Sequence, residues 1–341
     1  MPAPHSAFKS RRVIRYIIRR LIWAVVLFFA VTAITYAIFY VIPLDPARKI
    51  AGKSATEQDV QRVREQLHLD DPLYQQYGRF VKDIITQGSL GYSYSNRIEV
   101  TDTIRDAAPI TAALVFGGMI FWLLVSIPIG VYSALHPRSR WDRAAMLLVL
   151  IGISAHPVWI GLLLSYFLGY KLDDWTGTDI FPIQGYCDAF SPPPGASCGG
   201  YYDWFSHLIL PWSAIMVLYA AFYVRMIRAT TMETLNEDFV RTARAKGASE
   251  RRVLVRHVMR NSMLPVVTIL GMDLALALGG AVFIEIVFGL PGLGKEAVSS
   301  VYAFDYPVTM GLTVFATLVI ILFNLIVDIL YAFIDPRIRL A

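Results

Sequence analysis

The chain has 341 residues, of which 56% are hydrophobic and 17% are charged. Its mean hydropathy of +0.51 is too high for an ordinary soluble domain. The formal net charge is +5, but the basic residues gather in a few short clusters between apolar runs. This distribution indicates membrane topology and argues against nucleic-acid binding.

Six apolar runs approach the length that crosses a hydrocarbon core of about 30 Å. They are residues 21–42, 110–135, 144–170, 208–224, 263–288 and 308–327. Basic residues cluster before the first run, near residue 140, throughout 225–260 and after the last run, whereas 173–206 has no Lys or Arg. The positive-inside rule therefore predicts an all-α polytopic protein with six transmembrane helices and both termini in the cytoplasm.

The segments outside these runs define the expected organisation. Residues 1–20 form a basic cytoplasmic tail, and 21–42 is too long for a signal-peptide core, so we expect a retained first helix. Residues 44–108 are charged but balanced in sign, and apolar residues recur at helical spacing within 58–69. They predict a small extracytoplasmic helical cap, which serves either as a spacer or as a docking surface. Residues 109–335 form the membrane core.

Within that core, residues 173–206 form an extracytoplasmic insertion that holds the two cysteines of the chain, Cys187 and Cys198. Disulfides persist on the outer side of a membrane, so we predict that these two residues are bonded to each other. In the third run, His156 precedes Pro157. It is either a proton relay or a structural residue that fills a helix kink and hydrogen-bonds a freed carbonyl oxygen, and we favour the structural role.

The most distinctive stretch is the hydrophilic loop 229–262, for which we predict a short basic amphipathic helix over residues 236–246. Thr234 and Glu237 have the spacing of a capping box. Phe239, Val240 and Ala243 are expected to share one face. The left-handed conformation that Gly247 adopts at little cost should end the helix.

This loop resembles the ATPase-docking loop of ABC-importer permeases, and more narrowly that of the peptide/nickel branch. The resemblance is carried by Asp238-Phe-Val-Arg-Thr-Ala-Arg-Ala-Lys-Gly247, His257-Val-Met-Arg-Asn261 and Leu264-Pro265. Arg241-Thr242-Ala243 stands where the general family has Glu-Ala-Ala, a change that the peptide branch tolerates. Further phrases, from Tyr16-Ile-Ile-Arg-Arg to Asp335-Pro-Arg337-Ile-Arg339, extend the resemblance over nearly the whole chain.

The resemblance implies a fold like that of type I ABC-importer permeases and a set of site residues. The implied ATPase-docking residues are Glu237, Asp238, Phe239, Arg241, Thr242, Ala243, Ala245 and Gly247. Residues 285–294 resemble the Glu-x-x-Phe-x-x-Pro-Gly-Leu-Gly phrase of the family, which places Pro291 and Gly292 beside the substrate path. Asp273 and Glu285 either face that path or are satisfied inside the helix bundle, and the sequence leaves both readings open.

The implied protein is a peptide-importer permease in the bacterial plasma membrane. Its implied partners are a second, homologous permease, two cytoplasmic ATPases, an extracytoplasmic substrate-binding protein and membrane lipid. No cofactor or metal is expected on this chain, and ATP and Mg²⁺ belong to the ATPases. Gly289-x-x-x-x-Gly294-Lys295 nearly matches a P-loop, but Glu296 replaces the magnesium-binding Ser or Thr and the topology places it outside.

Two other classes compete with this interpretation. An ion-gradient-driven secondary transporter would use His156, Asp273 or Glu285 as coupling groups, but it leaves helix 236–246 without a role. An intramembrane enzyme would need a catalytic constellation at membrane depth, and the sequence presents none. The sequence does not separate dipeptides, longer peptides and nickel chelates as cargo.

Overall fold

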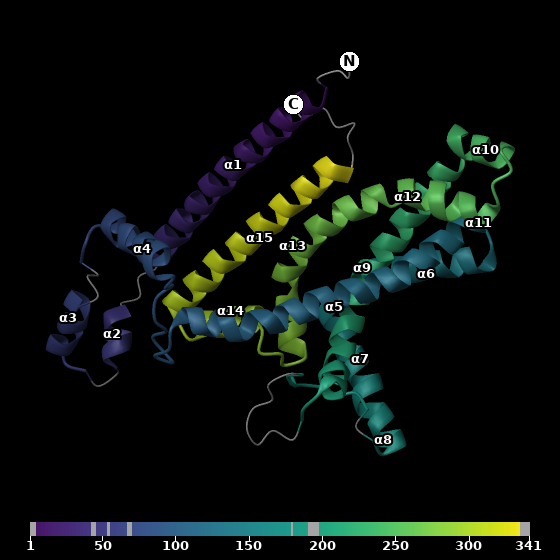
Figure 1. Ribbon diagram of the computed structural model, residues 1–341. Coiled ribbons are helices and arrows are strands. Elements are labelled where there is room, and N and C mark those ends of the chain that lie inside the picture. The colour runs from purple at the N-terminus through teal and green to yellow at the C-terminus, as the bar shows by residue number, and fades with distance from the viewer. Residues whose placement is uncertain are drawn as a thin grey trace. The chain divides into compact units, whose positions relative to one another are not determined.

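The computed structural model describes residues 5–41, 46–52, 55–66, 70–178, 180–189 and 198–334. Within these ranges every regular element is helical, and a single isolated antiparallel bridge joins Tyr92 to Glu99. The chain forms two compact units, residues 1–109 with 292–341 and residues 110–291. Helix α5 (Val100–Leu135) supplies residues to both units (Figure 1).

The first unit contains α1 (His5–Val41), α2 (Pro46–Ala51), α3 (Glu57–Gln66), α4 (Leu73–Gln87), the start of α5, α14 (Leu293–Tyr302) and α15 (Tyr306–Ile334). The second contains the rest of α5, α6 (Arg140–Ser154), α7 (Pro157–Leu164), the π-helical η1 (Ser165–Lys171), α8 (Leu172–Thr176), α9 (Tyr201–Leu235), α10 (Asp238–Ala245), α11 (Glu250–Arg252), the π-helical η2 (Val253–Val258), α12 (Met259–Ser262) and α13 (Leu264–Val287).

In the first unit, α1 and α15 lie side by side and run in opposite directions (Figure 1). A buried cluster of Val100, Ile104, Val308 and Leu312 packs the start of α5 against α15. A Cβ atom on Gly311 would lie 2.5 Å from Cγ1 of Val100. Only glycine therefore lets these two helices approach so closely.

Asp305, which is 2% exposed, organises the turn that precedes α5. Its carboxylate accepts hydrogen bonds from the Ser93 hydroxyl at 2.6 Å and from the backbone N–H groups of Tyr94 and Ser95 at 3.1 and 3.0 Å. Three donors satisfy a carboxylate that would otherwise be costly to bury. Burial also raises the pKa of Tyr94 to about 12.

In the second unit, α9 packs against α6, α7 and α13. Helix α5 approaches α9 closely at two glycines, because a Cβ atom would lie 2.1 Å from the Trp212 ring at Gly117 and 2.8 Å from Ile227 at Gly130. The Trp212 Nε1–H donates to the carbonyl of Ala113 at 3.1 Å. A tight contact between α5 and α9 thus lies within this unit.

Among the described residues, four helices, α1, α5, α9 and α15, are long and apolar enough to cross a membrane, and the number rises to six if each of two bent helix pairs is one span. The all-helical elements of the described ranges, with four to six candidate spans, agree with the predicted fold class. The third expected run is not simply kinked, because residues 140–154 and 157–176 meet at 109°. The fourth is longer than expected, since α9 continues through Pro211 from Tyr201 to Leu235.

Other expected boundaries shift by several residues. The helix expected within 58–69 is α3, Glu57–Gln66. Helix α5 begins at Val100, inside the segment 44–108 that was expected to form the cap, and α9 begins at Tyr201, inside the expected insertion 173–206. The expected C-terminal phrase at 335–339 lies outside the described residues.

Candidate functional site

The predicted helix of loop 229–262 is present as α10, but it is shorter than expected and begins differently. It covers Asp238–Ala245, about two turns, with Glu237 at the N-cap and no side-chain cap. The predicted capping box is wrong. Thr234 belongs to the last turn of α9, where its hydroxyl donates to the carbonyl of Thr230 at 2.7 Å.

The apolar residues of α10 differ in burial. Val240 and Ala243 are 0% and 9% exposed and pack against Val253 and Val258 of η2. Phe239 lies one turn before Ala243 on the same side of α10, as expected, but it is 40% exposed and stands outside that buried cluster. The loop therefore has a small core of its own, and Phe239 is the large apolar side chain that α10 presents outward.

Polar contacts hold α10 in place. Arg244 donates from Nε and Nη2 to the carboxylate of Glu250 at 2.9 and 3.2 Å, linking α10 to α11. Arg241 lies 3.5 Å from Asp238 on the exposed side of the helix. Gly247 has a φ of +79°, which confirms the predicted left-handed stop.

The remaining expected docking residues lie along the same short segment. Glu237, Asp238, Arg241, Thr242, Ala245 and Gly247 are exposed. The Thr242 hydroxyl donates back to the carbonyl of Asp238 at 2.9 Å. Apart from Ala243, the predicted docking residues are thus accessible along α10 and its two ends.

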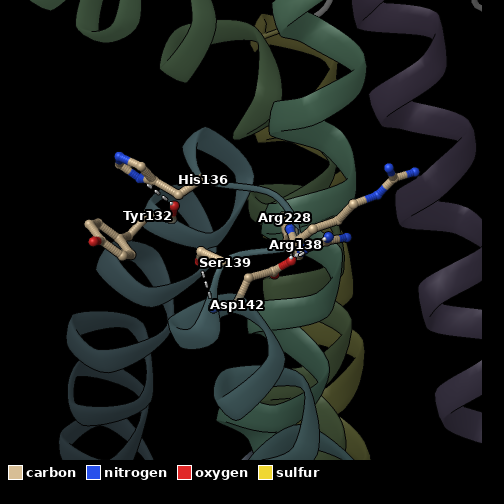
Figure 2. Close-up of polar contacts among 6 residues, drawn as sticks. All are labelled: Tyr132, His136, Arg138, Ser139, Asp142 and Arg228. Carbon is tan, nitrogen blue, oxygen red and sulfur yellow. Dashed lines mark hydrogen bonds and ion pairs between the residues drawn. The ribbon is translucent and has the colours of Figure 1, made fainter.

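A second polar cluster, which the sequence reasoning missed, joins α6 to α9 (Figure 2). Arg228 donates from Nε and Nη2 to the two carboxylate oxygens of Asp142 at 2.7 and 3.0 Å. The backbone N–H of Arg138 donates to the same carboxylate at 2.8 Å. The side chain of Asp142 is only 5% exposed and that of Arg228 is 25% exposed. The pair is therefore a largely buried, bidentate clamp.

The contact between Ser139 and Asp142 could have been predicted from a local sequence pattern. Ser139-x-x-Asp142 before an apolar run has the spacing of a capping box, and Ser139 Oγ indeed accepts from the Asp142 N–H at 3.1 Å. Nothing in the sequence pairs Asp142 with Arg228, because the two residues are 86 positions apart.

The acidic residues that were candidates for the substrate path have partners within the second unit. Glu285 is 0% exposed and accepts from the Thr111 hydroxyl at 2.6 Å. Asp273 accepts from the Tyr223 hydroxyl at 2.8 Å. Pro291 is exposed, and Gly292 is the N-cap of α14. The two carboxylates thus contribute hydrogen bonds between helices of this unit.

His156 has a structural contact of the kind that the sequence favoured, although its partner is different. Its Nδ1 accepts from the backbone N–H of Val158 at 3.3 Å and so caps the start of α7. The expected partner was a freed carbonyl oxygen. The bend between α6 and α7 is thus stabilised by a side chain at its vertex.

The predicted disulfide between Cys187 and Cys198 is confirmed. The segment before it packs on its neighbours, because the Gly185 N–H donates to the carbonyl of Phe288 at 3.0 Å. A Cβ atom on Gly169 would lie 2.5 Å from Cγ1 of Ile183. Residues 183–185 of the insertion are therefore packed against η1 and the end of α13 within the second unit.

Comparison with known proteins identifies the family. The model of the binding-protein-dependent transport system inner membrane component matches residues 126–340, and the model of the N-terminal part of such membrane components matches residues 13–115. The chain belongs to this permease family. The first match alone covers more than half of the permease and includes α10 and the Asp142–Arg228 clamp.

Curated relatives align with the permease over almost their whole length. A probable D,D-dipeptide transport system permease protein DdpB of Escherichia coli K12 is 37% identical over 334 residues, 94% of this chain and 97% of the relative. The glutathione transport system permease protein GsiC and the dipeptide transport system permease protein DppB, both of E. coli K12, are 36% and 35% identical, and each alignment covers 96% of this chain and 99% of the relative.

Proposed function

We propose that this permease is one of two membrane subunits of an ABC importer for dipeptides or oligopeptides in the bacterial plasma membrane. The peptide cargo is supported by the names of two relatives, which transport dipeptides, and by the peptide/nickel-type phrases in the sequence. The proposed partners are a homologous permease, two cytoplasmic ATPases that bind ATP and Mg²⁺, and an external substrate-binding protein. The charge pattern supports cytoplasmic termini and loops near 140 and 240.

The same proposal places residues 44–108 and the insertion 173–206 outside the cell. The helices α2, α3 and α4 would form a small extracytoplasmic cap that meets the substrate-binding protein. Pro291 and Gly292 stay path candidates on the strength of the family phrase. Asp273 and Glu285 are assigned to holding the helices around the path, because each carboxylate already accepts a hydroxyl hydrogen bond.

The observation that carries the proposal is the form of α10. A short helix is held by its own small core and by the Arg244–Glu250 pair, so its outer surface is preorganised for a partner. That surface presents one aromatic side chain, Phe239, surrounded by charged and small residues. An exposed aromatic anchor with a polar rim is typical of a protein–protein hot spot. We propose that it binds a groove on the cytoplasmic ATPase.

The buried position of Ala243 decides which substitution tests this docking. A charge at Ala243 would disturb the packing against Val253 and Val258 and would unfold the loop itself. Phe239→Glu changes an exposed side chain and leaves that core intact. Loss of an aromatic hot spot weakens an interface by about 2 kcal/mol or more, roughly 30-fold in affinity.

The experiment is to purify the tagged permease from native membranes in a mild detergent and to measure the Mg²⁺-dependent ATPase activity that co-purifies. We expect wild type to carry ATPase activity and Phe239→Glu to lose most of it at equal permease yield. Tyr74→Glu is the matched control, because Tyr74 is an aromatic residue that is 71% exposed on α4, on the proposed outer side. It should keep the ATPase.

Two results would contradict the proposal. If Phe239→Glu retained the ATPase at the wild-type level, α10 would not be the docking helix. If wild type carried no ATPase even after cross-linking, and peptide uptake followed an ion gradient instead, the ATP-driven mechanism would be wrong. Peptide uptake by vesicles of the complete importer, competed with dipeptides, longer peptides and nickel chelates, identifies the cargo.

A further inference from the structure

An apolar groove of about 730 Å³ lies between α5, α6 and α9. Its walls include Pro128 and Tyr132 of α5, Ala144 and Leu148 of α6, and Val217 and Ala221 of α9. Small residues form much of the surface, and a Cβ atom on Gly152 would already lie 3.0 Å from the Cβ of Ala221. The groove is therefore a built feature of the helix packing, open along one side.

The length of the groove matches one leaflet of a bilayer. On α6 the lining residues extend from Trp141 to Gly152, which is about 16 Å at the α-helical rise. A hydrocarbon core is about 30 Å thick, so a spanning helix of a partner protein would need a groove roughly twice as long. An acyl chain of one leaflet fits this length.

Basic side chains continue the walls at one end. Arg140 precedes Ala144 by one turn on α6 and Arg225 follows Ala221 by one turn on α9, while His136 comes four residues after Tyr132, directly beyond the end of α5. All three are exposed, and among the residues that the structure describes neither Arg140 nor Arg225 has an ion-pair partner.

The aromatic residues at this end have the placement of membrane-interface residues. Trp141 is 72% exposed, and the Tyr132 ring lies 4.5 Å from the His136 ring. Figure 2 shows that the side chain of Arg138 points away from Tyr132 and His136, so it does not belong to this group. Arg228 does not belong to this group either, because its guanidinium is paired with Asp142. The groups left at the groove end are thus the guanidinium groups of Arg140 and Arg225, together with the His136 ring.

We propose that this groove is a binding site for an acidic phospholipid of the cytoplasmic leaflet. One acyl chain lies against the apolar walls, and the phosphate is bound by Arg140 and Arg225 beside His136. An apolar slot that ends in basic residues on the cytoplasmic side is complementary to an anionic lipid. The inference rests on the proposed cytoplasmic position of the α5–α6 turn and does not depend on the peptide cargo.

The site is tested with the complete importer, purified through a tag on this permease and stripped of lipid in detergent. Phosphatidylglycerol or phosphatidylcholine with the same acyl chains is then added, and bound lipid is counted by native mass spectrometry. We expect wild type to prefer phosphatidylglycerol. The double variant Arg140→Gln/Arg225→Gln should lose that preference, with affinity falling roughly fivefold for each arginine removed. Ala144→Phe, which fills the groove, should lower the binding of both lipids.

Arg143→Gln is the matched control, since Arg143 is exposed in the first turn of α6 and does not line the groove. Equal binding of the two lipids by wild type, an equal loss in the control, or unchanged binding in Ala144→Phe would each overturn the proposal. A photoreactive benzoylphenylalanine at position 148 distinguishes a lipid in the groove from a protein partner. A cross-link to phospholipid supports the site, whereas a cross-link to the second permease shows that the groove is a subunit interface.

Discussion

The clamp between Asp142 and Arg228 should be one of the larger single contributions to the stability of the second unit. Asp142→Asn keeps the shape of the side chain but leaves a guanidinium that is three-quarters buried without its counter-charge. Breaking a fully buried ion pair costs about 3–5 kcal/mol. Because Arg228 is 25% exposed, water screens part of that cost, and we expect a loss of about 2–3 kcal/mol.

The reciprocal change gives the second leg of a double-mutant cycle. Arg228→Gln leaves a carboxylate that is 5% exposed and retains only the Arg138 N–H among its described donors, so a similar loss is expected. In the double variant both charges are gone. We therefore expect a total loss close to that of either single variant, which corresponds to a coupling free energy of about 2 kcal/mol.

The assay is unfolding of the purified permease in mixed detergent micelles with increasing sodium dodecyl sulfate, followed by tryptophan fluorescence. Arg143→Gln, which removes a neighbouring exposed charge, should change the free energy of unfolding by less than about 0.5 kcal/mol. Strictly additive losses in the two single variants would refute the reasoning, because they would mean that the two side chains stabilise the unit independently.

Three further predictions follow from contacts within each unit. Gly117→Ala should destabilise the permease by about 1–3 kcal/mol, because its Cβ would lie 2.1 Å from the Trp212 ring; Trp212→Phe in the same chain should recover part of the loss in the micelle assay. Asp305→Ala should lower the free energy of unfolding by about 2–3 kcal/mol, since three donors at residues 93–95 lose their acceptor. The turn before α5, which contains these donors, should then become sensitive to limited proteolysis. Alkylation without reductant should leave Cys187 and Cys198 unlabelled, and Cys187→Ser should expose one thiol and cost about 3 kcal/mol; labelling of both thiols in wild type would exclude the bond.

The sequence was informative where a local pattern decides the structure. The apolar spacing of Val240 and Ala243 and the freedom of Gly247 predicted α10 and its end, and the position of the two cysteines predicted their bond. The exposure of Phe239 could not be predicted, because it depends on how far the small core formed with η2 extends along α10. Thr234 does not cap α10, because α9 continues through it, and a capping pattern alone does not reveal where the preceding helix ends.

Contacts between distant residues were beyond the reach of the sequence. The Thr111–Glu285 bond joins residues 174 positions apart, and the Asp142–Arg228 clamp joins residues 86 positions apart. A charged residue has many candidate partners along the chain, and only the placement of α5 beside α13 and of α6 against α9 selects among them. The need for a glycine at position 117 could likewise not be predicted from the sequence, because it depends on the Trp212 ring that faces it.

The way the insertion is fixed has an evolutionary consequence. Ile183 occupies the space that a side chain at position 169 would need, and Gly185 is bound to Phe288. A chain without the insertion has no such restriction, so a larger residue at 169 would be neutral there and harmful here. Among relatives, we expect the insertion and a glycine at 169 to be gained and lost together. Grafting the insertion onto a relative would then require replacing the residue at 169 by glycine in the same step.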